Sequence, residues 1–381
     1  MQKRNIYIMY AIALLQGMVF YGPIATLYRQ SAGLSIFQIT IIESISLGLM
    51  ILFELPWGII ADYIGYKKSM IICICLFFFS KIIFWQAESF IMFLIERIIL
   101  GIVAAGLSGL DTSILYLSIP KEKAQHVFSI YNNLGTVGLL LASGIYAILI
   151  KDNYRLASFL TMITYGIAAI FSLALKEVKG EIKNININQS IKSFKLYFID
   201  LKNHKTFILF LLSIALIRET HQTITVFLNQ LQYIKCGASN NTIGLIYIFI
   251  TLTGLLSIFS VNMTIKFGEK NLMFNLIIIM TASCLILSFT NNIIISVAAV
   301  TMIQIAYRLI QPLELTIQNR QITSSNRATR LSMNAVIIDG IAIFTNILYG
   351  KFADINISMA MFLGFILCGS ALIFYHSWLN S

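Results

Sequence analysis

Long apolar stretches alternate with shorter polar ones along almost the whole chain. A helix needs about 20 consecutive apolar residues to cross the hydrocarbon core of a bilayer, so each long stretch predicts one membrane-spanning helix. Six helices are expected at residues 5–28, 36–61, 68–87, 89–118, 125–150 and 155–176, and six more at 205–232, 241–265, 271–290, 292–318, 329–351 and 355–378. The pattern predicts an all-α integral membrane protein of about twelve transmembrane helices.

One long polar stretch separates the two sets of six helices. We therefore predict an N-terminal six-helix bundle at residues 1–176, a basic cytoplasmic linker at 177–204 and a C-terminal six-helix bundle at 205–381. Residues 190–201 of the linker place apolar side chains at helical spacing between lysines, which suggests an amphipathic helix on the inner leaflet. A solvated basic loop is the alternative.

The composition excludes several classes of protein. Of the 381 residues, 58% are hydrophobic and 11% are charged, whereas soluble domains have about 45–50% apolar and about 25% charged residues. A soluble enzyme, a secreted disulfide scaffold and a disordered protein are therefore excluded. The five cysteines form no CxxC pair and show no regular spacing, so we expect no metal site, no disulfide framework and no cofactor.

The basic residues predict the orientation in the membrane. With the N-terminus in the cytoplasm, 18 of the 27 Lys and Arg residues fall in inner segments, 5 in outer segments and 4 within spans. Lys and Arg accumulate in cytoplasmic loops. We therefore place both termini in the cytoplasm and the chain in the cell membrane. This distribution accounts for the net charge of +11 without invoking nucleic acid.

The loop between the second and third spans carries the most specific motif, which reads Gly58-Ile-Ile-Ala-Asp62-Tyr-Ile-Gly65-Tyr66-Lys67-Lys68. Its glycines allow a tight turn, and a carboxylate such as that of Asp62 can accept hydrogen bonds from a helix N-terminus. The motif resembles the loop signature of the major facilitator superfamily, although Tyr66 stands where the family has its first basic residue. The resemblance implies a cytoplasmic gate whose residues here would be Gly58, Asp62, Gly65, Lys67, Lys68 and Asp111.

The fourth span extends this resemblance. Arg97 is followed by Gly101 and small residues, as in the fourth helix of the superfamily. The stretch Ser108-Gly-Leu-Asp111 and the residues 327–332 look like patterns of bacterial small-molecule exporters in the same superfamily. The Gly-Pro signature that antiporters of the superfamily carry in the fifth span is absent from residues 125–150, which weakens the resemblance to proton-coupled drug antiporters.

Polar side chains recur at helical spacing in the seventh and tenth spans. Such stripes are costly against lipid, so they must face water, a ligand or each other. The resemblance implies that the first, fourth, seventh and tenth helices line a central cavity, and hydrogen bonding between helices is the alternative. The candidate cavity residues are Gln16, Tyr21, Arg97, Arg218, His221, Gln222, Thr225, Asn229, Gln304, Tyr307, Arg308 and Gln311.

Further charged residues fall within the spans. Glu219 and Asp339 are candidates for proton coupling, because a low-dielectric environment favours the neutral form of a carboxyl group. Glu43 and Lys81 are both expected in the outer part of the first bundle and could pair. For each of these groups a structural ion pair between helices is the alternative to a functional role.

These features predict a secondary active transporter that works by alternating access. The chain has no GxxxxGK[ST] motif for ATP hydrolysis and no HExxH motif, and its four histidines are scattered, so we do not expect an enzyme. The exporter-like residues favour proton-coupled export of a small amphipathic molecule or drug. Uptake of a small nutrient is the alternative, and a membrane-embedded enzyme is a weaker one. The expected partners are the substrate, protons and the lipid bilayer, with the protein as a monomer.

Overall fold

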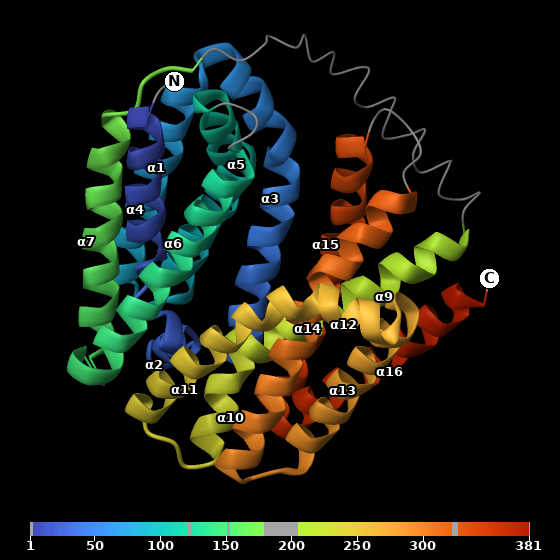
Figure 1. The fold of residues 1–381 in the computed structure, drawn as a ribbon. Coiled ribbons are helices and arrows are strands. Elements are labelled where there is room, and N and C mark those ends of the chain that lie inside the picture. The colour runs from blue at the N-terminus through green and yellow to red at the C-terminus, as the bar shows by residue number, and fades with distance from the viewer. Residues whose placement is uncertain (1–2, 120–123, 151–152, 179–204, 322–326, 381) are drawn as a thin grey trace. The chain divides into compact units, whose positions relative to one another are not determined.

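The computed structural model describes residues 3–119, 124–150, 153–178, 205–321 and 327–380, and nearly all of them are helical (Figure 1). The predicted all-α membrane fold is confirmed. Eleven helices in the described ranges are long and apolar enough to cross a membrane, and a shorter apolar helix covers Asn240–Thr253. The predicted amphipathic helix at 190–201 lies outside the described residues.

The first six predicted spans correspond to consecutive helical segments. The first is built from α1 (Lys3–Gly17), the 3₁₀ helix η1 (Gly22–Ile24) and α2 (Ala25–Ser31). It is followed by α3 (Ile36–Ile64), α4 (Tyr66–Gln86), α5 (Phe90–Ser118), α6 (Ala124–Ile145) with the π-helix η3 (Tyr146–Ile150), and α7 (Tyr154–Leu173).

The second six spans follow the same order. The seventh is built from α9 (Lys205–Gln222), the π-helix η4 (Thr223–Leu228) and α10 (Asn229–Lys235). The eighth consists of α11 (Asn240–Thr253), the 3₁₀ helix η5 (Gly254–Phe259) and α12 (Ser260–Phe267). The last four are α13 (Glu269–Phe289), α14 (Ile293–Gln321), α15 (Arg327–Ile355) and α16 (Ile357–Leu379).

Contacts between Cα atoms divide the chain into two compact units. Unit 1 comprises residues 1–34, 45–184 and 240–248, and unit 2 comprises 35–44, 185–239 and 249–381. The division cuts through two helices, because the first residues of α3 belong to unit 2 and the first residues of α11 belong to unit 1. The division of the chain into two six-helix halves in sequence order stays a prediction.

The two units repeat the same helix pairings. In unit 1, α4 packs on α5 and α7, and α1 packs on α6 and α7. In unit 2, α13 packs on α14 and α16, and α9 packs on α15 and α16. Each pairing therefore recurs between helices of the same rank in the two sets of six.

Glycines with positive φ also recur at corresponding turns. Gly33 follows α2 and Gly237 follows α10, 204 residues later, with φ values of 86° and 83°. Gly65 precedes α4 and Gly268 precedes α13, 203 residues later, with φ values of 94° and 76°. L-residues with a side chain rarely adopt these conformations, so glycine is favoured at all four turns. This recurrence supports an internal duplication despite the scarcity of matching side chains.

In unit 1, small residues allow two helices to approach closely. A Cβ atom added at Gly17 of α1 would collide with the backbone of Gly135 on α6, and one added at Gly138 would collide with the carbonyl oxygen of Leu14. Helices in membranes associate through such close backbone contacts, because lipid gives little hydrophobic driving force between them. Trp57 of α3 belongs to the hydrophobic core of unit 1, and it donates from Nε1 to the carbonyl oxygen of Ile102 at 2.7 Å.

In unit 2, the start of α3 is fixed by side-chain hydrogen bonds. Ser35 and Gln38 form a capping box, in which Ser35 Oγ accepts from the Gln38 N–H at 3.2 Å and Gln38 Oε1 accepts from the Ser35 N–H at 3.0 Å. The Ile36 N–H donates to Asp354 Oδ1 on α15 at 2.7 Å. A carboxylate at a helix N-terminus is electrostatically favourable, so Asp354 stabilises the contact between the start of α3 and α15.

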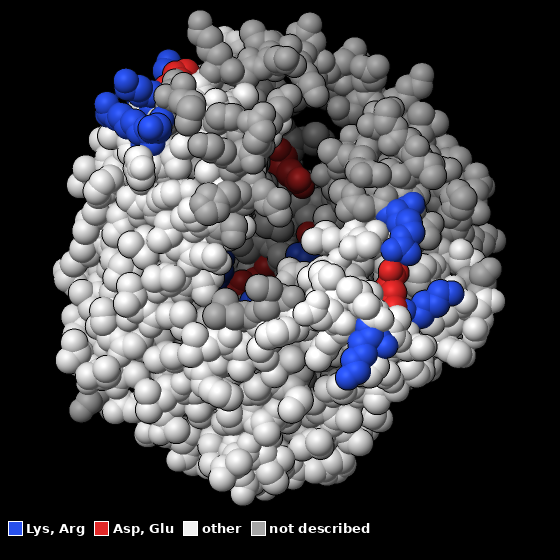
Figure 2. All heavy atoms as spheres, in the orientation of Figure 1, with Lys and Arg blue, Asp and Glu red and all other residues white. Residues whose placement is uncertain are grey.

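The described surface suits a lipid environment. Many large apolar side chains are exposed, among them Leu52, Ile148, Phe289 and Phe344. Figure 2 shows wide areas without charged side chains on the described part of one face, with the Lys and Arg side chains gathered in small groups. The protein is a multi-pass membrane protein; its orientation and the identity of the membrane stay predictions.

The packing of α3 on α15 can be tested at Gly350. A Cβ atom there would collide with the Thr40 side chain and the Phe37 backbone. We expect Gly350→Ala to lower the Tm of the detergent-solubilised protein by several degrees, because overpacking costs about 1–3 kcal/mol.

The matched control is Gly340→Ala on the same helix, where an added Cβ would meet no atom within 4 Å. Alanine is the better helix former, so this variant should melt at or above the wild-type temperature. Equal melting of the two variants would contradict the described packing.

Candidate substrate and coupling site

The polar stripes of the seventh and tenth spans meet inside unit 2. His221 of α9 places Nε2 at 2.6 Å from Gln304 Oε1 of α14, and its ring stacks on Tyr307 with centroids 4.1 Å apart. All three residues are buried. The Gln304 amide and the His221 ring therefore satisfy each other's hydrogen bonding. Hydrogen bonding between helices was the alternative to a cavity lining in the sequence analysis.

An ion pair between α9 and α15 lies about one turn of α9 before His221. Arg218 of α9 forms an ion pair with Asp339 of α15, with 3.5 Å between the guanidinium nitrogen and Oδ1. The Arg218 side chain is 43% exposed and that of Asp339 is 11% exposed. Glu219 is buried and accepts a hydrogen bond from the Thr223 hydroxyl at 2.7 Å. The two proton-coupling candidates thus belong to one region of unit 2.

Two other predicted cavity residues donate hydrogen bonds to backbone carbonyl groups of the seventh span. Thr225 donates its hydroxyl to the His221 carbonyl oxygen at 2.8 Å, and Asn229 donates from Nδ2 to the Thr225 carbonyl oxygen at 2.8 Å. These carbonyls lie next to or within the π-helix η4, where the regular i→i+4 ladder is interrupted. π-Helical turns are rare and occur frequently at functional sites.

The remaining predicted residues of unit 2 differ in exposure. Gln222 and Gln311 are exposed, and Arg308 is partly buried. Gly254, at the start of η5, lies against Gln304 and Arg308: an added Cβ would be 3.4 Å and 3.5 Å from their side-chain nitrogens. These are ordinary van der Waals distances, so η5 packs directly on the polar side chains of α14 at this position.

Glu314 also belongs to this region and was not predicted from the sequence. This residue of α14 is buried; Gln318 Nε2 donates to its Oε1 at 3.0 Å, and Asn334 Nδ2 donates to Gln318 Oε1 at 3.0 Å. Glu314 interacts electrostatically with Arg218, as do Asp339 and Glu219. Its place three residues after Gln311 and four before Gln318 puts it on the polar stripe, so the helical spacing was the signal that could have identified it.

In unit 1, the buried charges of Lys81 and Glu96 connect two predicted site residues, Tyr21 and Arg97. Lys81 donates from Nζ to Glu96 Oε1 at 2.9 Å and to the Tyr21 hydroxyl at 3.0 Å. Arg97 Nε lies 3.4 Å from Glu96 Oε2. Sequence reasoning offered Glu43 as the partner of Lys81, whereas Glu96 is its partner in the structure. Gln16 contributes its backbone carbonyl, which accepts from the Tyr165 hydroxyl at 2.7 Å.

The predicted gate residues lie near the turn between α3 and α4. Gly58 and Asp62 belong to the last turns of α3, but the Asp62 side chain is not among those described. Gly65 makes the turn, and the Lys67 N–H donates to Glu177 Oε1 at 3.2 Å. Lys68 is exposed, and Asp111 accepts from the Thr112 N–H at 2.6 Å. The gate therefore stays a prediction.

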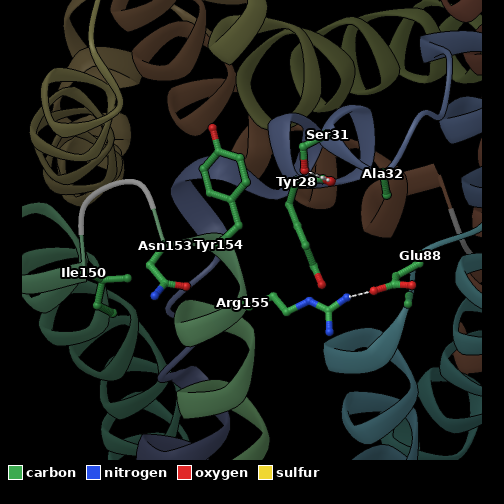
Figure 3. A pocket seen from close by; sticks show the side chains of 9 residues that line it. Tyr28, Ser31, Ala32, Glu88, Ile150, Asn153, Tyr154 and Arg155 are labelled. Carbon is green, nitrogen blue, oxygen red and sulfur yellow. Dashed lines mark hydrogen bonds and ion pairs between the residues drawn. The ribbon is translucent and has the colours of Figure 1, made fainter.

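A pocket of about 870 Å³ lies at one end of unit 1, away from these residues. Figure 3 shows Tyr28 extending toward the ion pair that Arg155 forms with Glu88. Tyr28 also donates to the backbone carbonyls of Phe84 and Trp85. The pocket contains none of the predicted site residues. In the described residues, no group of three His, Cys, Asp or Glu side chains is arranged to bind a metal ion.

Comparison with known proteins identifies the family. The model of the Major Facilitator Superfamily matches residues 6–234, more than half of the chain. The chain therefore belongs to the Major Facilitator Superfamily, as the loop motif and the fourth span predicted. It is a transporter and not an enzyme.

Individual relatives are distant. An uncharacterised MFS-type transporter of Methanocaldococcus jannaschii is 26% identical over 155 residues, which is 40% of each chain, so the match spans two fifths of that relative's length. The crystal structure of a point mutant of the nucleoside transporter NupG has a TM-score of 0.83 at 15% identity, covering 99% of both chains. A D-xylose–proton symporter has a TM-score of 0.73 at 14% identity, covering 97% of both chains. These structural likenesses establish the shared fold.

Proposed function

We propose that this transporter is proton-coupled, works by alternating access and exports a small amphipathic molecule across the cytoplasmic membrane. The observation that carries the proposal is the Arg218–Asp339 ion pair with Glu219 beside it. Ionisable residues within membrane spans are expensive to bury, and in transporters they are typical of proton and substrate pathways.

The charge balance of this region favours a cationic group on the substrate. Three carboxyl groups, those of Glu219, Glu314 and Asp339, interact electrostatically with the guanidinium group of Arg218 on α9. The second arginine of the region, Arg308, lies on the polar stripe of α14. A cation that binds a carboxylate competes with a proton for the same oxygen atoms. Protonation would therefore expel the cation, and an inward proton gradient would drive it out of the cell.

Proton-coupled uptake of a small nutrient is the second candidate. Protonation of Asp339 would release Arg218, which could then hold an anionic or hydrogen-bond-accepting group together with the proton. The absence of the Gly-Pro signature from residues 125–150 and the structural likeness to a D-xylose–proton symporter favour this reading. The two candidates differ in the direction of proton flow relative to substrate.

The gating proposal completes the cycle. We place the gate residues Gly58, Asp62, Gly65, Lys67, Lys68 and Asp111 on the cytoplasmic side, with both termini in the cytoplasm and the protein as a monomer. A carboxylate at a helix N-terminus contributes about 0.3–1 kcal/mol, and up to about 2 kcal/mol when partly buried. Each 1.4 kcal/mol changes an equilibrium constant about tenfold. Such a contact is therefore large enough to shift the equilibrium between the inward-open and outward-open states.

The first functional prediction concerns the arginines of the polar stripes. Arg218→Ala and Arg308→Ala should each lower the initial transport rate at least tenfold with near-normal membrane expression, because each removes a charge from a polar stripe. The rates are measured in proteoliposomes with ethidium, uridine and D-xylose as probes.

The matched control is Arg320→Ala, which removes the exposed ion pair between Arg320 and Glu269. This variant should transport at the wild-type rate. If Arg218→Ala and Arg308→Ala also do so, the polar stripes only pack helices together and the site assignment is wrong.

The second functional prediction concerns coupling. We expect efflux of ethidium, an amphipathic cation, to accelerate at least tenfold with a pH gradient, and Asp339→Asn to abolish this acceleration because its side chain cannot release a proton. Exchange of external for internal ethidium without a gradient should slow as well, because an amide, like a protonated carboxyl group, binds the cation weakly. Glu219→Gln tests the second candidate carrier in the same assay, and Glu269→Gln is the control on a partly exposed carboxyl group outside the polar stripes.

Three results would contradict this account. Flux that follows sodium or membrane potential alone would exclude proton coupling. An unchanged response to the pH gradient in both Asp339→Asn and Glu219→Gln would exclude these carriers. Co-transport of protons with uridine or D-xylose would establish uptake in place of export.

A further inference from the structure

Four side chains form a continuous polar chain inside unit 1. The Tyr21 hydroxyl lies just before η1, Lys81 lies on α4, and Glu96 and Arg97 are neighbours on α5. Successive atoms are 3.0 Å apart between Tyr21 and Lys81, 2.9 Å between Lys81 and Glu96, and 3.4 Å between Glu96 and Arg97. Tyr21 and Arg97 are predicted cavity residues, whereas Lys81 and Glu96 had no assigned part in the site.

The two central charges are held tightly. The Lys81 and Glu96 side chains are 3% and 0% exposed, whereas that of Arg97 is 17% exposed. The Lys81 ammonium group also lies 5.2–5.8 Å from the ring centroids of Tyr21, Phe77, Phe84 and Tyr165. Cation–π contacts of this kind are stabilising when the cation is desolvated. These four aromatic rings restrict the position of the Lys81 ammonium group.

A buried ion pair is weak evidence for a role in stability. Replacing both partners by neutral residues of similar volume is often neutral or stabilising, whereas removing one partner is costly. A pair that only joins α4 to α5 would therefore be dispensable. Its position between two predicted substrate contacts, Tyr21 and Arg97, points to a function in the site.

We propose that Lys81 and Glu96 are positioning residues for substrate binding. Lys81 donates to the Tyr21 oxygen, so the Tyr21 O–H is directed away from Lys81 and toward an acceptor on the substrate. The Glu96 carboxylate attracts the Arg97 guanidinium electrostatically, with 3.4 Å between Oε2 and Nε, and this attraction orients the guanidinium group toward the same acceptor, which would be a carbonyl, a ring nitrogen or an anionic oxygen. The inference rests on the proposed function only in taking Tyr21 and Arg97 as substrate contacts.

The positioning of Arg97 can be measured without any substrate. The purified full-length protein in detergent is treated with p-hydroxyphenylglyoxal, which modifies arginine, and the modification rate of Arg97 is followed by mass spectrometry. Arg218, whose side chain is 43% exposed, is the internal reference. Glu96→Gln should raise the rate at Arg97 at least threefold by removing the carboxylate. Lys81→Met should lower it, because Glu96 then interacts more strongly with Arg97.

The matched control is Glu88→Gln, which removes the exposed carboxylate paired with Arg155. It should leave the rate at Arg97 unchanged. Unchanged Arg97 reactivity in Glu96→Gln would overturn the proposal. Because the assay uses neither a substrate nor a pH gradient, its outcome is independent of whether transport proves to be proton-coupled.

Transport kinetics separate positioning from structure. The probe is whichever of ethidium, uridine and D-xylose the wild-type protein transports. The double variant Lys81→Met with Glu96→Gln removes both charges, so the fold should persist. Its KM should nevertheless rise at least fivefold with kcat within about twofold, and Lys81→Arg should restore part of the affinity lost in Lys81→Met. A double variant with wild-type KM would show that the pair is only structural.

Discussion

A polar or charged group inside the hydrocarbon core must find its partner within the protein, because lipid offers none. This constraint organises both units. In unit 1, the ammonium group of Lys81 is paired with Glu96 and surrounded by aromatic rings. In unit 2, Arg218 pairs with Asp339 and the His221 ring with Gln304. These three pairs each join groups of one unit, and the proposed chemistry uses them.

The same constraint explains two irregular helical segments of unit 2, η4 and η5. A π-helix interrupts the backbone ladder of the seventh span, and the hydroxyl of Thr225 and the amide of Asn229 satisfy carbonyl groups at this interruption. The eighth span changes to a 3₁₀ helix where Gly254 lies against Gln304 and Arg308. Irregular backbone is tolerated at membrane depth where it is buried in protein or lines a cavity. These two irregular segments, η4 and η5, accompany the polar side chains of unit 2, which supports a function for this region.

The helices and their family could be predicted from the sequence because apolar length and the loop motif are local signals. The turn at Gly65 was also predictable, because the loop motif places a glycine there. In the structure this glycine adopts a φ of 94°. The partner of Lys81 was not, because pairing across helices depends on rotation and depth that one sequence does not encode. Glu314 was overlooked although its spacing placed it on the polar stripe, and the exchange of the first residues of α3 and α11 between units arises from contacts distant in sequence.

The central claim is that the buried charges of Lys81 and Glu96 compensate each other within unit 1. A thermal double-mutant cycle on Lys81 and Glu96 tests it most directly, with Tm measured for Lys81→Met, Glu96→Gln and the double variant in the same detergent. Removing one partner of a buried pair costs about 3–5 kcal/mol, whereas removing both is often neutral. The account predicts that the double variant melts above both single variants. Additive losses in Tm would contradict it, because they would show that the two charges are stabilised independently.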